Sequence, residues 1–166
     1  MTPLFPHLFQ QIKIGNYTLK NRIVNAGHAA HYQGEGGLPD DRYVHYVRER
    51  AKGGAGLIIL GNSVVYNDGE VPLSMSNHDN AIIPIYQKMS AATHEFDVPL
   101  IAQLGHRGKM VVDSAWLLGR PLFAPSAIPS PDFSSPQFMP HEMDLDEIEE
   151  AVQQFASASD RVKQGG

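Results

Sequence analysis

The sequence predicts an α/β fold in which the strands form a parallel sheet. Short apolar runs alternate with longer segments of helical periodicity, and the central runs lack the polar alternation of a half-exposed strand. The order strand, helix, repeated three times, is typical of right-handed βαβ units. A chain of 166 residues, of which 42% are hydrophobic, can bury one core, so we expect one domain over residues 1–166.

The composition excludes several classes of protein. Because the chain has no cysteine, it cannot form a disulfide, a thiolate zinc site, a cysteine-ligated iron–sulfur cluster or a cysteine nucleophile. The net charge of −5, without any basic block, argues against binding to a nucleic-acid backbone. No run approaches about 20 apolar residues, and the N-terminus lacks a signal-peptide pattern. We therefore expect a cytoplasmic protein without nucleic-acid or membrane partners.

The N-terminal part predicts a hairpin followed by a strand. Residues 12–14 and 17–19 alternate with period two around Gly15 and Asn16, residue types that tolerate positive φ in tight turns. The β-branched run 22–26 then stops at a glycine, and we interpret it as the first buried strand.

The remaining elements follow from helical spacing and from apolar runs. In chain order they are a helix from the N-cap Asp40 to Gly53, a strand over 56–60, a polar loop over 61–78, a helix over 81–96, a strand over 100–104, a long Pro- and Ser-rich segment over 109–142 with turns and a small hairpin, and a helix from Asp144 to Val162. The last helix has the clearest start, because Asp144 and Glu147 have the spacing of a capping box.

Small and polar residues follow each predicted strand of the sheet. In parallel α/β proteins, ligands bind at the carboxyl ends of the strands. The three segments there are 25–31, 61–63 and 103–109, and glycines in each let a planar ligand approach the backbone. Gln103 offers both an amide donor and a carbonyl acceptor. The pattern indicates a pocket for an aromatic, hydrogen-bonding ligand, and the alternative is that these segments are only tight turns.

Five motifs in order resemble the Old Yellow Enzyme-like flavin oxidoreductases, especially the branch of trimethylamine dehydrogenase, 2,4-dienoyl-CoA reductase and amine N-demethylases. They are LFQQIKIGNYTLKNRIV at 8–24, RAKGGAGLIILG at 50–61, PLIAQLGHRGK at 99–109, APS at 124–126 and EMDLDEIEEAVQQFASASDRVKQGG at 142–166. The resemblance implies a (β/α)₈ barrel that binds FMN. Residues 1–166 would then be the N-terminal part of this domain, with a hairpin and the first three βα units, and the barrel would be incomplete within this chain.

The resemblance also implies which residues bind the flavin. The proposed FMN contacts are Ala26, Gly27, His28, Ala29, Gly61, Asn62 and, at the pyrimidine edge of the ring, Gln103. His28 and His106 are the candidate catalytic side chains, NAD(P)H is the implied reductant, and no metal site is expected. The position at which trimethylamine dehydrogenase binds its flavin covalently through a cysteine is Ala29 in this chain, so the expected FMN is non-covalent.

The resemblance leaves the reaction open. Asn62 stands where trimethylamine dehydrogenase has a tyrosine of its substrate cage, and Tyr66 or Trp116 are the aromatic candidates to replace it. A small-molecule substrate could undergo oxidative N-demethylation of a methylated amine, which His28 beside the flavin favours, or reduction of an activated C=C bond in an enone or dienoyl-CoA. A hypothesis of another class is a truncated, non-catalytic fragment or assembly module. In the family, the strand that would come next carries substrate-binding histidines, and residues 1–166 do not include it. Homo-oligomerisation is a further expectation.

Overall fold

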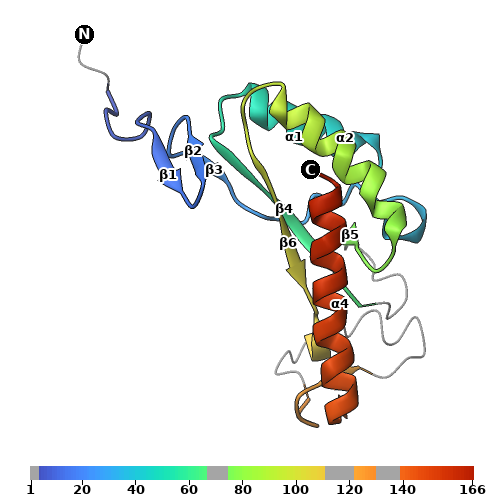
Figure 1. The fold of residues 1–166 in the computed structure, drawn as a ribbon. Coiled ribbons are helices and arrows are strands. Elements are labelled where there is room, and N and C mark those ends of the chain that lie inside the picture. The colour runs from blue at the N-terminus through green and yellow to red at the C-terminus, as the bar shows by residue number, and fades with distance from the viewer. Residues whose placement is uncertain (1–3, 67–74, 111–121, 130–138) are drawn as a thin grey trace.

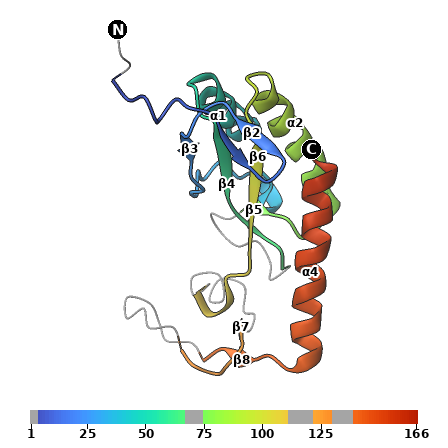
Figure 2. The same ribbon diagram turned by 60° about the vertical axis from the view of Figure 1, so that its left-hand side comes forward.

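In a computed structural model, the structure describes residues 4–66, 75–110, 122–129 and 139–166. A parallel sheet lies at the centre, three helices pack on one side of it, and a small hairpin stands at one end (Figures 1 and 2). The strands are β1 Ile12–Ile14, β2 Tyr17–Leu19, β3 Val24–Asn25, β4 Leu57–Val64, β5 Met75–Ser76, β6 Leu100–Gly105, β7 Phe123–Ala124 and β8 His141–Glu142. The helices are α1 Asp41–Lys52, α2 Ile83–His94 and α4 Leu145–Gln164, with 3₁₀ turns η1 Glu35–Gly37, η2 Asn80–Ile82 and η3 Gly108–Met110.

The sheet is parallel, as predicted, and β4 is its central strand. β3 and β6 pair with β4 on opposite sides, and the short strand β5 pairs with the C-terminal end of β4 opposite β6. Strand β5 lies within the segment predicted to be a polar loop, and β4 continues to Val64, beyond the predicted end. The parallel order along the chain places the carboxyl ends of β3, β4 and β6 at one edge of the sheet.

The prediction of a buried first strand over 22–26 is wrong. Strand β3 has only two residues, and the Val24 side chain is 44% exposed. Val24 and Ile101 both lie on the face of the sheet opposite the helices, where each remains largely exposed. An apolar run shows that a residue is suited to burial, but only the packing of other elements decides whether its face is covered.

The hydrophobic core lies between β4 and the helices α1 and α2. Its fully buried side chains come from all of these elements and from η2, and they include Val47, Ile58, Leu60, Ile82 and Met89. The 3.6-residue period of the helices and the two-residue period of β4 place these side chains on facing surfaces. This packing fixes the position of α1 over β4, which the site described below requires.

The helix ends confirm most of the predicted boundaries. Asp40 caps α1 by accepting a hydrogen bond from the backbone N–H of Arg42. Asp144 and Glu147 form the predicted capping box, in which each side chain accepts from the other residue's backbone N–H, at 2.9 and 2.8 Å. Helix α2 is shorter than the predicted 81–96 because its start is the 3₁₀ turn η2 and the chain turns at Asp97, which adopts a positive φ of 55°.

The predicted apolar face of the last helix exists, but it is mostly exposed. Leu145 is 82% exposed, and Ile148, Val152 and Phe155 are exposed as well. Ala158 is the fully buried residue of α4, and the helix contacts the rest of the molecule mainly through its C-terminal half, beside α2 and β6 (Figure 1). Periodicity therefore predicted the face correctly but could not show how far it is covered.

In the described part of the segment 109–142, the predicted hairpin is not found. The described parts of this segment contain β7 and β8, which pair with each other in parallel, with Phe123 opposite His141. A hairpin would require antiparallel strands. The remaining residues, 111–121 and 130–138, lie outside the described part of the chain.

Tyr86 on α2 generates a prediction for stability at high pH. Burial raises the pKa of Tyr86 to about 12, against an ordinary value of about 10, although its hydroxyl lies 3.0 Å from the Ser63 hydroxyl. Between pH 10 and pH 12 the unfolded chain loses this proton and the folded chain keeps it, so the stability that Tyr86 contributes below pH 10 is lost as pH rises. We expect the free energy of unfolding to fall by about 2 kcal/mol more over this range in the wild type than in Tyr86→Phe, measured by urea denaturation. An equal fall in both proteins would contradict this.

Candidate functional site

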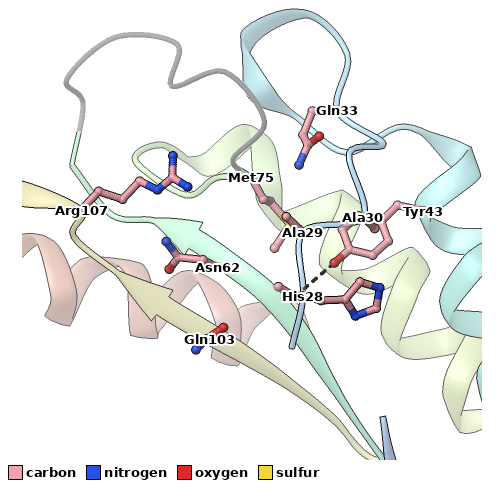
Figure 3. A pocket seen from close by; sticks show the side chains of 10 residues that line it. His28, Ala29, Ala30, Gln33, Tyr43, Asn62, Met75, Gln103 and Arg107 are labelled. Atoms are coloured by element: carbon pink, nitrogen blue, oxygen red, sulfur yellow. Dashed lines mark hydrogen bonds between the residues drawn. The ribbon is translucent and has the colours of Figure 1, made fainter. Parts of the chain in front are cut away.

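A cavity of about 120 Å³ lies at the carboxyl ends of the parallel strands (Figure 3). It is lined by His28, Ala29, Ala30, Gln33, Tyr43, Gly61, Asn62, Met75, Gln103 and Arg107. Five residues proposed from the sequence as flavin contacts are among them: His28, Ala29, Gly61, Asn62 and Gln103. The structure thus brings together side chains from the segments after β3, on β4 and on β6, which are far apart in the sequence.

Glycines allow the segment after β3 to lie directly against β4 and β6. A Cβ atom at Gly27 would stand 2.8 Å from the Leu60 carbonyl oxygen and 2.9 Å from Gln103 Oε1, both too close for an ordinary contact. A Cβ at Gly61 would overlap the His28 carbonyl oxygen. Gly27 and Gly61 are therefore required by close backbone approach, and they leave a compact, flat floor beside the cavity.

Two side-chain amides are available at this floor. Asn62 and Gln103 are register partners on β4 and β6, and both line the cavity. Within the described part of the chain, neither amide makes a hydrogen bond. Each therefore offers two N–H donors and a carbonyl acceptor to a ligand, and a ring with alternating donors and acceptors along one edge matches this set. The residues present fit the pyrimidine edge of a flavin.

A β-bulge in β4 turns Asn62 toward the cavity. Ile59 pairs with Ile101 and Asn62 pairs with Gln103, so two residues of β4 stand opposite one residue of β6. The extra residue reverses the alternation of the strand, so that Asn62 lies on the same face as Ile59. The next residue, Ser63, is then fully buried on the helix side, where its hydroxyl meets that of Tyr86.

Tyr43 of α1 stabilises this bulge. Its hydroxyl accepts a hydrogen bond from the backbone N–H of Gly61 at 3.1 Å, and its side chain is only 3% exposed (Figure 3). Burial raises the pKa of Tyr43 above its ordinary value of about 10, so the phenol keeps its proton in alkaline solution in which a free phenol begins to lose it. Tyr43 thus connects the position of α1 to the conformation of β4 at the cavity.

The imidazole of His28 is held by protein groups on both sides. Its Nδ1 lies 3.2 Å from the Ala26 carbonyl oxygen, and its Nε2 lies 2.6 Å from the Tyr46 hydroxyl. A carbonyl can only accept, so Nδ1 carries the proton, and Nε2 of the neutral ring accepts from Tyr46. The ring therefore has a fixed orientation toward α1, with Arg50 stacked 3.8 Å above the Tyr46 ring centroid.

His106, the second candidate, lies outside this cavity. Its Nδ1 accepts from the backbone N–H of Gly108 at 3.1 Å, and its ring packs against Tyr66 with centroids 5.1 Å apart. Tyr66 also packs against Phe123, so it does not line the cavity as the proposed substitute for a cage tyrosine. The other substitute, Trp116, lies outside the described residues.

The cavity is small for a whole cofactor. Ligand pockets commonly have volumes of roughly 300–1,000 Å³, so about 120 Å³ holds one part of a ligand of flavin size. In the ranges that the structure describes, no group of three or more acidic or histidine side chains could hold a metal ion. None of the helices in these ranges is long and apolar enough to cross a membrane.

Some lining residues had no sequence signal for this role. Tyr43 keeps the apolar spacing of α1, and Met75 belongs to a strand that was not predicted. Arg107, in contrast, lies in the segment 103–109 from which the pocket was predicted. For Tyr43, a hydroxyl at a core position is the one available signal, because a buried hydroxyl usually has a hydrogen-bond partner.

The bulge generates a prediction for Tyr43→Phe. This variant keeps the ring in the core but leaves the buried N–H of Gly61 without its acceptor, which costs about 1–3 kcal/mol. We expect the free energy of unfolding to fall by that amount, measured by urea denaturation. The matched control is Tyr17→Phe on the exposed hairpin, for which a change within about 0.5 kcal/mol is expected. Equal stability of the two variants would show that the Gly61 bond contributes nothing.

Comparison with known proteins places these observations in context. The chain matches the NADH:flavin oxidoreductase / NADH oxidase family over residues 7–166. It is 35% identical to N,N-dimethylglycine/sarcosine dehydrogenase of Chromohalobacter salexigens, over 98% of this chain and 23% of the relative. The chain thus spans about a quarter of the length of that protein.

Two solved structures have the same arrangement of elements. A 2-naphthoyl-CoA reductase in complex with 2-naphthoyl-CoA is similar with a TM-score of 0.87 and 26% identity, over 98% of this chain and 26% of that one. The Old Yellow Enzyme homologue of Zymomonas mobilis is similar with a TM-score of 0.86 and 27% identity, over 97% of this chain and 46% of that one. The α/β fold described above therefore corresponds to one portion of these larger proteins.

Proposed function

The chain belongs to the NADH:flavin oxidoreductase / NADH oxidase family, and we propose that it forms the flavin-ring part of an FMN-dependent oxidoreductase acting on a small methylated amine. In this proposal residues 1–166 are the N-terminal part of one FMN-binding domain and supply the first three βα units of its barrel. We place the protein in the cytoplasm and take NAD(P)H as a further source of reducing equivalents. Assembly into a homo-oligomer also agrees with the proposal.

The observation that carries this proposal is the pair of available amides over a compact backbone floor. Gln103 and Asn62 face the cavity without other hydrogen bonds in the described part of the chain, and Gly27 and Gly61 let the segment after β3 lie directly against β4, which makes a compact floor. When bound, FMN supplies the hydride-transfer chemistry, while the protein orients the ring and excludes water. Because Ala29 offers no nucleophile, FMN is held without a covalent bond.

The other proposed FMN contacts lie beside the same backbone floor. Ala26, Gly27, His28 and Ala29 contribute compact backbone beside the ring, and Gln103 binds its pyrimidine edge. His28 and His106 are the two catalytic side chains proposed from the family resemblance. Of these, His28 lines the cavity and receives a hydrogen bond from the Tyr46 hydroxyl at Nε2, whereas His106 lies outside the cavity against Tyr66, so that His28 is the first to test.

The choice of reaction rests on the similarity to the C. salexigens protein, whose name states that it acts on N-methylated glycines. Oxidative N-demethylation is therefore our first proposal. Reduction of an activated C=C bond is the second, because a solved structure of similar fold is a reductase of an aromatic CoA thioester. A truncated, non-catalytic assembly module is the third possibility that the experiment below must address.

Turnover assays separate these functions. Because residues 1–166 are one part of the barrel in this proposal, the complete protein that contains them is purified with FMN. It is supplied with N-methylated amino acids in one series, and with enones or dienoyl thioesters plus NAD(P)H in the other. We expect formaldehyde release and flavin reduction in the first series. Reduction of only the second group of substrates would replace the first proposal with the ene-reductase, and absence of turnover in both would favour the module.

Gln103→Leu tests the position of the flavin. The substitution removes the amide that hydrogen-bonds the ring and leaves a ligand group unpaired, so FMN binding is expected to weaken by roughly 1–3 kcal/mol. The dissociation constant is measured by quenching of FMN fluorescence.

The matched control is Gln11→Leu, which makes the same change at an exposed residue just before β1. Its FMN affinity is expected to equal that of the wild type. If Gln103→Leu bound FMN as tightly as Gln11→Leu, the flavin edge would not lie at Gln103.

A further inference from the structure

We infer that the cavity recognises a substrate that carries a carboxylate, and that Arg107 binds this carboxylate. The inference rests on the proposed function and specifies its substrate class, because it distinguishes methylated amino acids from simple methylated amines. The evidence is the charge of the cavity lining, the availability of the Arg107 guanidinium and its place relative to the flavin-facing amides.

The described lining of the cavity carries a single permanent charge, and it is positive. Of the ten lining residues, Arg107 is the only Arg or Lys, and none is Asp or Glu. An amine without a carboxylate enters as a cation, which such a lining repels and for which it offers no counter-charge. A methylated amino acid brings a carboxylate with its ammonium group, so its anionic end matches the lining.

The guanidinium of Arg107 is available for a ligand. Other arginines of the chain are used within the protein: Arg42 pairs with Asp40, Arg48 with Glu95, and Arg161 binds Asn77. Arg107 has no hydrogen bond or ion pair within the described ranges. A planar guanidinium presents its donors as a fork that fits both oxygens of a carboxylate, so an unused fork beside a cavity is suited to this group.

The place of Arg107 agrees with a role in substrate binding. It follows the end of β6, four residues after Gln103, and its side chain extends over the same side of the cavity as Asn62 (Figure 3). The amides of Asn62 and Gln103 lie at the floor of the cavity, and Arg107 lies beyond them toward the exterior, where it is exposed. A molecule that binds above the floor would therefore meet Arg107 with its outward end.

A pair of ligands that differ only in charge tests this inference. N,N-dimethylglycine has a carboxylate, and N,N-dimethylglycinamide has a neutral amide of nearly the same shape. Their dissociation constants are measured by calorimetry with the protein whose FMN has been reduced beforehand, so that N,N-dimethylglycine binds but is not oxidised. We expect the wild type to bind the carboxylate at least about tenfold more tightly than the amide, because a hydrogen bond to a charged group is lost in the amide.

Variants then identify the side chain responsible. Arg107→Gln is expected to bind both ligands with equal, weak affinity, whereas Arg107→Lys keeps part of the preference through its point charge. The matched control is Arg22→Gln, an exposed arginine that precedes β3 at the opposite end of the sheet, and it should retain the full preference.

Two results would overturn the inference. They are equal affinity of the wild type for both ligands, and a preference that Arg107→Gln retains. A failure of the proposed function is distinguishable from either, because it shows as absence of FMN binding. In that case calorimetry of the flavin-free protein with the same two ligands still decides whether Arg107 selects the carboxylate.

Discussion

The close approach of two backbone segments at Gly61 is the constraint on which the site depends. The segment after β3 passes so near to β4 that a side chain at Gly61 would overlap the His28 carbonyl oxygen. At the same place β4 contains a bulge, and the freed N–H of Gly61 binds the Tyr43 hydroxyl of α1. A glycine, a bulge and a buried phenol are thus needed together, because the glycine allows the approach and the phenol satisfies the backbone that the bulge leaves unpaired.

This constraint separates the two faces of β4. Before the bulge, Ile58 and Leu60 pack into the core under α1 and α2, and after it Ser63 continues on that side. Asn62 lies on the other face with Gln103. One strand therefore contributes both to the hydrophobic core and to a polar cavity, and the core packing that stabilises the fold also holds the cavity in shape. Helix α1 is connected to the site by the hydrogen bond from the Gly61 N–H to the Tyr43 hydroxyl.

The same asymmetry explains the exposed apolar residues. The helices cover one face of the sheet, while Val24 and Ile101 on the other face and Leu145 on α4 remain exposed. Strands of a parallel sheet are normally covered on both faces, and their sequences are accordingly apolar on both faces. The cavity lies at the edge of this open face, and its volume of about 120 Å³ is part of the space that a flavin and its substrate would require.

The sequence by itself determined the local structure and much of the floor of the site. Capping residues such as Asp40 and Asp144 act over a few residues, so the helix starts could be read directly, and the apolar runs predicted the parallel strands. Gln103 and Gly61 could be proposed because they follow or lie within such strands. Only the tertiary structure decided that Tyr43 contacts Gly61, that a bulge turns Asn62 toward the cavity, and which apolar faces stay exposed. These properties depend on contacts between residues distant in the chain, and a local pattern records a residue's suitability for burial or bonding but not the neighbour that the fold supplies.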